Sequence, residues 1–513
     1  MKLRRSNRIK GLVLAGIMCL ALVPPVPAKA DDGVDVGYTY NYDFWNEVRY
    51  SPDAYEVVGV YTAVDLGLET NFKNPDGLFV YGDLVFVCDT GNSRIIQWKK
   101  TSEGKFELER IITEVKGTEV TSLSGVTDIF IDQDRNFYIA DKGNERVIKT
   151  DWDMNVLMLF TKPVENTFDQ SLYFLPDKVV ADTEGRLYCV SDNINKGIIK
   201  YEADGSFSGF YGAMPAQYSW YQYIWKKISS AAQRAALESF VPTEYDNVAI
   251  DNEGFIYACS TNVSGSGLNN GSEEGVRRLN LLGKNILIQN GYDYVIGDVV
   301  WGNFAGYSGS SLFIDVTAFD DSGIYVCLDK TRGRLFTYDE QGELLFAFGG
   351  VGNMDGYFKG PVALEHMGTD LIVLDSIDNS FTVFTPTEYG NLIYQALEEY
   401  RRGDYIKSGE TWEEVRKING NYDLAYIGIG RSLKRQKKYK ESLKYFKTKW
   451  DRKNYSKAFK EYRKEWVEEN IAWIFAVLAL LIIVPLVRKK IKMIKWEIDT
   501  ADIFKNSDGG EKK

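Results

Sequence analysis

The chain has 513 residues and a formal net charge of −11. This acidic balance argues against a nucleic-acid groove, which needs a basic stripe. The single histidine, His366, leaves no multi-histidine zinc site and at most one histidine-based triad. Aromatic residues make up 14% of the chain, which favours β structure because aromatic side chains pack well on pleated surfaces.

Residues 1–30 have the pattern of a secretory signal peptide. A basic start is followed by a short apolar run over 11–23, and Ala28 and Ala30 form a small-x-small cleavage pattern. We expect the mature chain to begin at Asp31, although an uncleaved anchor is the alternative. Residues 31–54 then form an aromatic lead-in.

A repeated unit dominates the middle of the chain. The stretch from Phe72 to Trp98 predicts three short strands with polar turns between them, and similar stretches begin near Val126 and Asp177. Such a unit cannot bury both faces alone, so it implies a stack of itself. Weaker copies bring the count to six. The second strands of the six units end at Asp89, Asp141, Asp192, Ser260, Asp329 and Asp375.

Three of the five intervals between these ends, of 46 to 52 residues, are typical of propeller blades, and the two long intervals of 68 and 69 residues indicate insertions around the fourth blade. The strand at 55–66 has no partner nearby, and the last unit has only three strands before Pro386. Closing the ring with the N-terminal strand removes exposed strand edges. The sequence therefore predicts an all-β six-bladed β-propeller over residues 55–386.

The turn after the second strand carries a recognisable motif. Asp89-Thr-Gly-Asn92-Ser-Arg94 and Asp141-Lys-Gly-Asn144-Glu-Arg146 resemble the NHL repeat. The resemblance covers 55–386 and implies a bacterial, secreted, membrane-anchored propeller protein. We expect three arginines to pair with the repeat Asp or with turn carbonyls rather than with a ligand: Arg94, Arg146 and Arg334.

Four cysteines fall in the second strands of four different repeats. Widely spaced positions of this kind predict small buried side chains rather than a disulfide framework or a metal knuckle. They are Cys88, Cys189, Cys259 and Cys327.

Residues 388–466 change to a helical pattern. Pairs 34 residues apart match, such as Tyr405 with Tyr439 and Trp412 with Phe446, and the region resembles tetratricopeptide repeats. The stretch from Arg431 to Lys464 is rich in Lys and Arg. It is either a solvated helical face or a membrane-proximal patch that contacts anionic envelope polymer or lipid.

Residues 471–487 form an uncharged apolar run with the length of a short membrane span. A cluster of Lys and Arg follows at 488–495, and the positive-inside rule places that side in the cytoplasm. We expect a single-pass cell-membrane protein, with the propeller and the helical region outside and the tail 488–513 in the cytoplasm. A buried core helix is the alternative.

Three insertions flank the fourth blade, at 214–241, 262–275 and 289–310, and all are predicted on one face of the propeller. Loops on a rigid scaffold commonly carry function. Their aromatic residues either bind a ligand, such as a carbohydrate or a peptide, or only pack the insertions against the propeller. The candidate ligand-binding residues are Trp220, Tyr221, Tyr223, Trp225, Tyr292, Tyr294, Trp301 and Tyr307.

Aspartates recur near the starts of the first strands, where they would ring the mouth of the central channel. Oxygen ligands of this kind suit Ca²⁺, although aspartates at strand starts also cap turns. The candidate metal ligands are Asp76, Asp177, Asp246 and Asp315.

The main functional hypothesis is an extracytoplasmic, membrane-anchored binding or scaffold protein whose ligand is a glycan or an envelope protein. One alternative is a Ca²⁺-dependent lactonase-like hydrolase, because some propellers of similar build are lactonases. Another is an accessory subunit of a membrane transport or secretion complex. The residues show no assembled catalytic motif, and fold does not imply function.

Overall fold

The structure is a computed structural model, and it describes residues 38–165, 168, 170–213, 244–263, 274–287, 297–298, 310–319 and 322–507. The chain divides into two compact units, Met1–Tyr394 and Gln395–Lys513. The predicted signal peptide lies outside the described residues.

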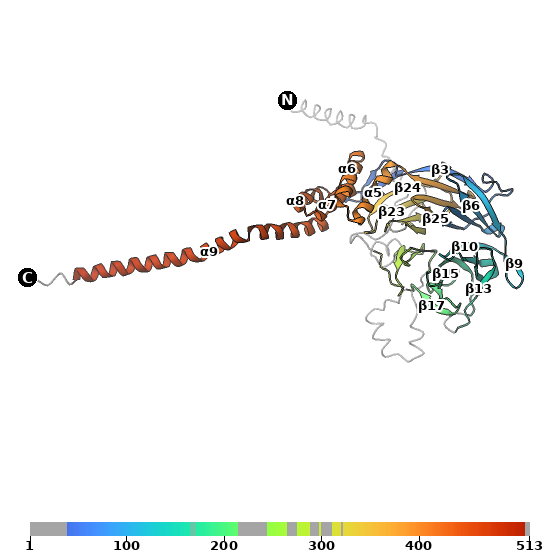
Figure 1. Cartoon of the computed structure of the whole chain (residues 1–513), viewed down its shortest axis with the longest axis horizontal. Coiled ribbons are helices and arrows are strands. Elements are labelled where there is room, and N and C mark those ends of the chain that lie inside the picture. The colour runs from blue at the N-terminus through green and yellow to red at the C-terminus, as the bar shows by residue number, and fades with distance from the viewer. Residues whose placement is uncertain are drawn as a thin grey trace, which may run out of the picture. The chain divides into compact units, whose positions relative to one another are not determined.

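The first unit is a six-bladed β-propeller (Figure 1), and each blade is an antiparallel meander. Blade 1 contains β4 (Gly77–Tyr81), β5 (Leu84–Asp89), β6 (Arg94–Lys100) and β7 (Phe106–Ile112). Blade 2 contains β10 (Val126–Ile131), β11 (Phe137–Asp141), β12 (Arg146–Thr150) and β13 (Val156–Phe160). Blade 3 contains β14 (Pro176–Ala181), β15 (Leu187–Ser191), β16 (Ile198–Tyr201) and β17 (Phe207–Tyr211).

The other three blades depart from the four-strand pattern or complete it from elsewhere. Among the described residues, blade 4 contains β18 (Asn247–Ile250), β19 (Ile256–Cys259) and β20 (Val276–Leu279). Blade 5 contains β21 (Phe313–Ala318), β22 (Tyr325–Asp329), β23 (Arg334–Tyr338) and β24 (Leu344–Gly349). Blade 6 contains β25 (Pro361–Met367), β26 (Asp370–Asp375) and β27 (Ser380–Pro386). A small hairpin of β8 (Glu114–Lys116) and β9 (Val120–Ser122) links blades 1 and 2.

Closure of the ring occurs as predicted. β3 (Tyr55–Thr62) pairs antiparallel with β27 and supplies the fourth strand of blade 6, with Tyr61 opposite Phe381. The first strands contact one another in the order β4, β10, β14, β18, β21, β25 and back to β4. They therefore surround a central channel.

The aromatic lead-in at 31–54 contributes two strands to blade 5. β1 (Thr39–Tyr42) pairs with β24, and β2 (Val48–Tyr50) pairs with β1, so blade 5 has six strands. Tyr40 lies opposite Ala347, about three hundred positions along the chain. A pairing this distant leaves no local sequence signal, because strand partners are chosen by packing and register.

The core lies between the blades, where the second strands are covered on both faces. Every residue of β5, β11, β15 and β22 is buried. The four predicted buried cysteines are confirmed as buried and free, and burial raises the pKa of each thiol. A raised thiol pKa disfavours the nucleophilic thiolate, so these cysteines serve as small core residues.

Five helices follow the propeller among the described residues: α5 (Glu388–Arg402), α6 (Tyr405–Ile418), α7 (Asp423–Arg435), α8 (Tyr439–Thr448) and α9 (Arg452–Ser507). Consecutive helices from α6 to α9 pack together. Trp412 packs on Gly428 and Phe446 packs on Gly430, where an added Cβ would lie 2.4 Å and 2.7 Å from the ring atoms. Glycines in α7 therefore admit both rings, but the tetratricopeptide assignment stays a prediction.

Helix α9 joins two regions that the sequence divides. The helical region 388–466 and the span 471–487 share this one helix, which includes Pro485 and continues to Ser507. One helix among the described residues is long and apolar enough to cross a membrane, and it is this one. The side chains of its apolar run are exposed, for example 74% for Trp473. These features are consistent with single-pass membrane anchoring.

Candidate functional site

In blades 1 and 2, the turns between the second and third strands, which we call the rim, are held by the same set of hydrogen bonds. In blade 1, the buried Asp89 carboxylate accepts hydrogen bonds from Lys73 N at 2.7 Å, Asn92 Nδ2 at 2.8 Å and Arg94 Nε at 2.7 Å. In blade 2, Asp141 accepts from Ser124 N, Asn144 Nδ2 and Arg146 Nε at 2.8, 2.9 and 2.8 Å. The predicted structural pairing of Arg94 and Arg146 is confirmed.

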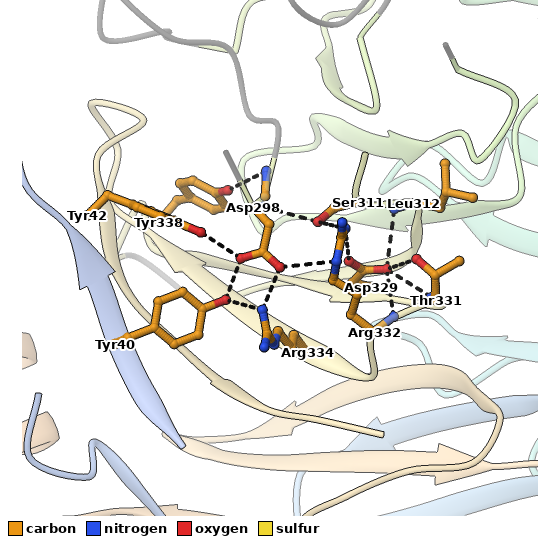
Figure 2. Close-up of polar contacts among 11 residues, drawn as sticks. Tyr40, Tyr42, Asp298, Ser311, Leu312, Asp329, Thr331, Arg332, Arg334 and Tyr338 are labelled. Carbon is orange, nitrogen blue, oxygen red and sulfur yellow. Dashed lines mark hydrogen bonds and ion pairs between the residues drawn. The ribbon is translucent and has the colours of Figure 1, made fainter. Parts of the chain in front are cut away.

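Blade 5 breaks this pattern at the corresponding arginine. Arg334 was expected to pair with the repeat Asp or with turn carbonyls, but its Nη1 atom lies 2.6 Å from Asp298 Oδ2 and 3.0 Å from the Tyr40 hydroxyl (Figure 2). Arg332 lies between two carboxylates, 3.3 Å from Asp298 and 3.6 Å from Asp329. Arg334 thus pairs with a carboxylate from the insertion 289–310.

Asp298 is the centre of a buried polar cluster, which we call the blade 5 anchor: Tyr40, Tyr42, Asp298, Ser311, Arg332, Arg334 and Tyr338. The hydroxyls of Tyr40 and Tyr42 donate to Asp298 Oδ1 at 2.6 and 2.8 Å. The backbone N–H of Asp298 donates to Ser311 Oγ at 3.0 Å. Figure 2 shows the side chains of Tyr40, Tyr42, Arg332 and Arg334 converging on the Asp298 carboxylate.

The electrostatics of the anchor follow from its burial. Burial raises the pKa of the Tyr40 hydroxyl, and the neighbouring Asp298 carboxylate raises it further. Burial alone would lower the pKa of Arg334, but Tyr40 and Asp298 raise it, so the guanidinium stays charged. Ions removed from water need both partners and hydrogen bonds to offset the cost of desolvation, and this cluster supplies both.

The anchor fixes one point inside the insertion 289–310. Gly297 and Asp298 are both hydrogen-bonded to blade 5, since Gly297 N donates to the Tyr338 hydroxyl at 3.2 Å. Sequence reasoning missed Tyr40 and Asp298. Two features of the sequence were available as signals. One is the pair of alternating tyrosines at positions 40 and 42, and the other, in a distant part of the chain, is the acidic residue Asp298 within the aromatic insertion 289–310.

The eight aromatic residues predicted to bind ligand lie outside the described residues. They are Trp220, Tyr221, Tyr223, Trp225, Tyr292, Tyr294, Trp301 and Tyr307. The described residues of the 289–310 insertion are Gly297, Asp298 and Ser310.

The central channel contains a cavity of about 300 Å³ lined by the six first strands. Its charged and titratable lining residues are Asp128, Lys178, Asp315, Glu365 and His366. Three carboxylates, one lysine and one histidine therefore line the same cavity.

Lys178 is the buried cation of the channel. Its Nζ atom lies 3.1 Å from the Asp76 carbonyl oxygen and 3.6 Å from Asp76 Oδ1. Burial alone would lower the pKa of Lys178, but the carboxylates of Asp76 and Asp128 raise it above its ordinary value. The lysine thus links blade 3 to blade 1 across the channel.

Two channel carboxylates instead bond to backbone N–H groups of the next blade. Asp128 accepts from Val179 N at 2.9 Å, and Asp315 accepts from Leu364 N at 2.6 Å. Burial raises the pKa of Asp128 and of Asp315 to about 7 in each case. Lys178 opposes this shift in both, and burial raises the pKa of Glu365 as well.

His366 lies near the end of β25, away from the strand starts, and lines the cavity. Its Nδ1 atom is 2.7 Å from Thr317 Oγ1, and its ring packs on Phe319 with centroids 5.3 Å apart.

The structure does not bring the four predicted metal ligands together. Asp76 faces Lys178 as described, Asp177 Oδ1 lies 2.5 Å from Lys142 Nζ, and Asp246 accepts from Thr261 N at 2.5 Å. Asp315 accepts backbone N–H groups. Within the described ranges, no group of three or more His, Cys, Asp or Glu residues is placed to hold a metal ion. The calcium assignment stays a prediction without an assembled ligand set in these ranges.

Comparisons with known proteins add only a likeness of fold. No family model matches the chain, and no curated protein matches it. A streptogramin B lyase structure is 10% identical, with a TM-score of 0.38, and the match covers 66% of this chain and 100% of the lyase. Virginiamycin B lyase from Staphylococcus aureus is 9% identical, with a TM-score of 0.34 and coverage of 61% and 94%. A catalytically inactive variant of that lyase with quinupristin is 9% identical, with a TM-score of 0.36 and coverage of 64% and 99%.

At these values the lyase structures carry no inference about activity. The propeller assignment stands on the strand pairing described above, and the class of protein is a six-bladed propeller joined to helices with one candidate membrane span. Any more specific function must be argued from the residues of this chain, because fold does not imply function.

Proposed function

We propose that this protein is a membrane-anchored binding protein of the cell envelope, whose propeller captures a glycan or an envelope protein through the insertions around blade 4. The proposed orientation places the propeller outside the cell and the tail after residue 487 in the cytoplasm. It rests on the Lys and Arg cluster that follows the apolar run of α9.

The observation that carries the proposal is the blade 5 anchor. A binding loop gains affinity when its support is rigid, because less conformational entropy is lost when ligand binds. Asp298 lies between Tyr294 and Trp301 in the sequence, and two arginines and two tyrosines hold it. A buried ionic cluster of this size is costly to build, which favours a role in positioning the aromatic residues on either side of it.

The binding test uses the full chain in detergent on an array of envelope glycans. Trp301→Ala and Tyr307→Ala should each weaken capture by roughly tenfold or more, as truncation of an aromatic binding residue does. Trp45→Ala serves as the matched control, because Trp45 is 65% exposed in the β1–β2 turn outside the insertions. Unchanged capture by both insertion variants would refute the ligand site.

The orientation test adds a protease to intact cells. Cleavage of the propeller supports the outside placement, and full protection of the propeller refutes it. Crosslinking of the intact membrane protein then separates the remaining possibilities. Recovery of membrane transport subunits in place of a glycan or an envelope protein would favour the accessory-subunit alternative.

A further inference from the structure

A strongly cationic surface lies outside the propeller, on helices α7, α8 and α9. From Arg431 to Lys464 the chain has fifteen Lys or Arg residues and three Asp or Glu residues. This stretch therefore carries a formal charge of +12 in a protein whose total is −11. Pairing with carboxylates outside the stretch, as in Lys449 with Asp423 and Lys464 with Glu468, removes only part of this excess of positive charge.

Most of these charged side chains lie on the exposed surface of the helices. Ile429, Phe446 and Ala458 are buried where α7, α8 and α9 pack together. The opposite faces carry exposed cations, which we call the cationic surface: Arg435, Lys437, Lys438, Lys440, Lys444, Lys447, Arg452, Lys453, Lys457, Lys460, Arg463 and Lys464.

Cations from two helices approach one another at Lys434. Its Nζ atom lies 3.4 Å from Asn454 Oδ1 of α9. Burial lowers the pKa of Lys434, and the positive charges of Lys457, Arg431 and Arg435 lower it further. Like charges held together in this way gain free energy when a polyanion neutralises them.

We propose that the cationic surface binds a phosphate-rich anionic polymer of the cell envelope. Rows of lysines on long flexible stems suit a flexible chain of phosphodiesters, because each is a point charge that needs no fixed geometry. Binding would release counterions and would weaken steeply with salt. The placement in the envelope rests on the proposed orientation, whereas polyanion binding itself does not.

The residues nearest the membrane favour a polymer over anionic lipid. Three exposed acidic residues, Glu465, Glu468 and Glu469, separate the cationic surface from the apolar run that begins at Ile471. Lys464 is seven residues from Ile471, or roughly 10 Å along the helix. Anionic headgroups would therefore meet negative charge first, and like charges repel.

The test measures binding of long-chain inorganic polyphosphate to the full chain in phosphatidylcholine nanodiscs. The variant K444Q/K447Q/K453Q/K460Q removes four charges from the cationic surface, and K99Q/K105Q/K116Q/K284Q removes four exposed charges from the propeller. We expect the first variant to weaken binding by roughly tenfold or more and to flatten the salt dependence. The control should stay within about twofold. Equal losses in both variants, or none in the first, would overturn the proposal.

A second measurement separates polymer from lipid. Acetylation of Lys444, Lys453 and Lys460, followed by mass spectrometry, reports whether the surface is covered. Polyphosphate should protect these lysines in phosphatidylcholine discs and leave Lys99 reactive. Equal protection in phosphatidylglycerol discs without polyphosphate would overturn the proposal in favour of lipid. Because glycan capture by the propeller is measured separately, failure here leaves the proposed function intact.

Discussion

The rim of the propeller and the wall of its channel both bury aspartates, but they balance the charge in different ways. On the rim, Asp89 and Asp141 pair with arginine at 2.7 and 2.8 Å. In the channel, Asp128 and Asp315 accept backbone N–H groups of the neighbouring blade. The rim carboxylates thus each face a guanidinium, whereas burial raises the pKa of the channel carboxylates Asp128 and Asp315 to about 7.

The comparison separates the contacts that belong to the repeat from the contacts that are specific to blade 5 or to the channel. A paired ion in a turn can be copied from blade to blade because its asparagine and arginine partners lie three and five residues away in the sequence. The blade 5 anchor and the channel wall instead depend on residues from distant parts of the chain, such as Tyr40 with Asp298. Substitutions in each region should therefore have different sizes and different pH dependence.

The largest effect is expected for Asp298→Ala. Removing this carboxylate leaves the buried Arg332 and Arg334 without it, which should cost about 3–5 kcal/mol of unfolding free energy. Urea unfolding measures the loss. Glu103→Ala is the control, because its pair with Lys105 is about three-quarters exposed on both sides and should contribute less than about 1 kcal/mol. Similar losses in both variants would show that the anchor is not a stabilising ionic cluster.

The blade repeats were predictable because their signals are local. Hydrophobic strands, the Asp-x-Gly-Asn turn and a regular spacing all lie within one unit, and the missing fourth strand of blade 6 pointed to closure by residues 55–66. The pairing of Arg94 and Arg146 followed for the same reason.

The blade 5 anchor was not predictable in this way. Arg334 occupies the repeat position, and nothing local shows that it pairs with Asp298, 36 residues away. The channel charges were missed for a related reason. Lys178 of blade 3 and Asp128 of blade 2 interact only when the two blades pack with their first strands side by side.

The free energy of unfolding should depend on pH through the channel carboxylates, and the variant Asp315→Asn tests this dependence. The pKa of Asp315 is about 7 in the folded protein, above its ordinary value of 3.8. The folded state therefore holds its proton through a range in which the unfolded state has lost it, and wild-type stability falls as pH rises from about 4 to 7. Asparagine cannot ionise, so the variant should gain about 1–4 kcal/mol relative to wild type between pH 4 and pH 8.

Urea unfolding at the two pH values checks this prediction. Asp128→Asn should behave in the same direction, because burial raises its pKa to about 7 as well. A stability difference that does not change with pH would show that the channel carboxylate is ionised throughout.

A smaller and more uniform effect is expected on the rim. Asp89→Asn and Asp141→Asn each remove the charge that holds an arginine, an asparagine and a backbone N–H, at a cost of about 1–3 kcal/mol. The two losses should agree within about 0.5 kcal/mol because the contacts are the same. Asp329→Asn should cost less, since its arginine partner Arg332 lies 3.6 Å away and also pairs with Asp298 at 3.3 Å. A larger loss for Asp329 than for Asp89 would contradict this account of blade 5.

The smallest effect concerns the backbone just before the third strand, where five blades share a left-handed residue. The φ angles are positive at Ser93, Glu145, Gly197, Gly333 and Asn379. Glu145, with φ at 53°, bears a Cβ in this conformation, so Glu145→Gly should stabilise the fold by about 0.5 kcal/mol.

Gly333→Ala is the reciprocal test of that turn. It should destabilise by about 1–2 kcal/mol, because φ is 59° and the new Cβ would lie 2.6 Å from the carbonyl oxygen of Gly350. Thermal unfolding of both variants gives the comparison. If Glu145→Gly is destabilising by the amount usual for glycine in a strand, the side chain of Glu145 contributes more to the turn than its backbone strain costs.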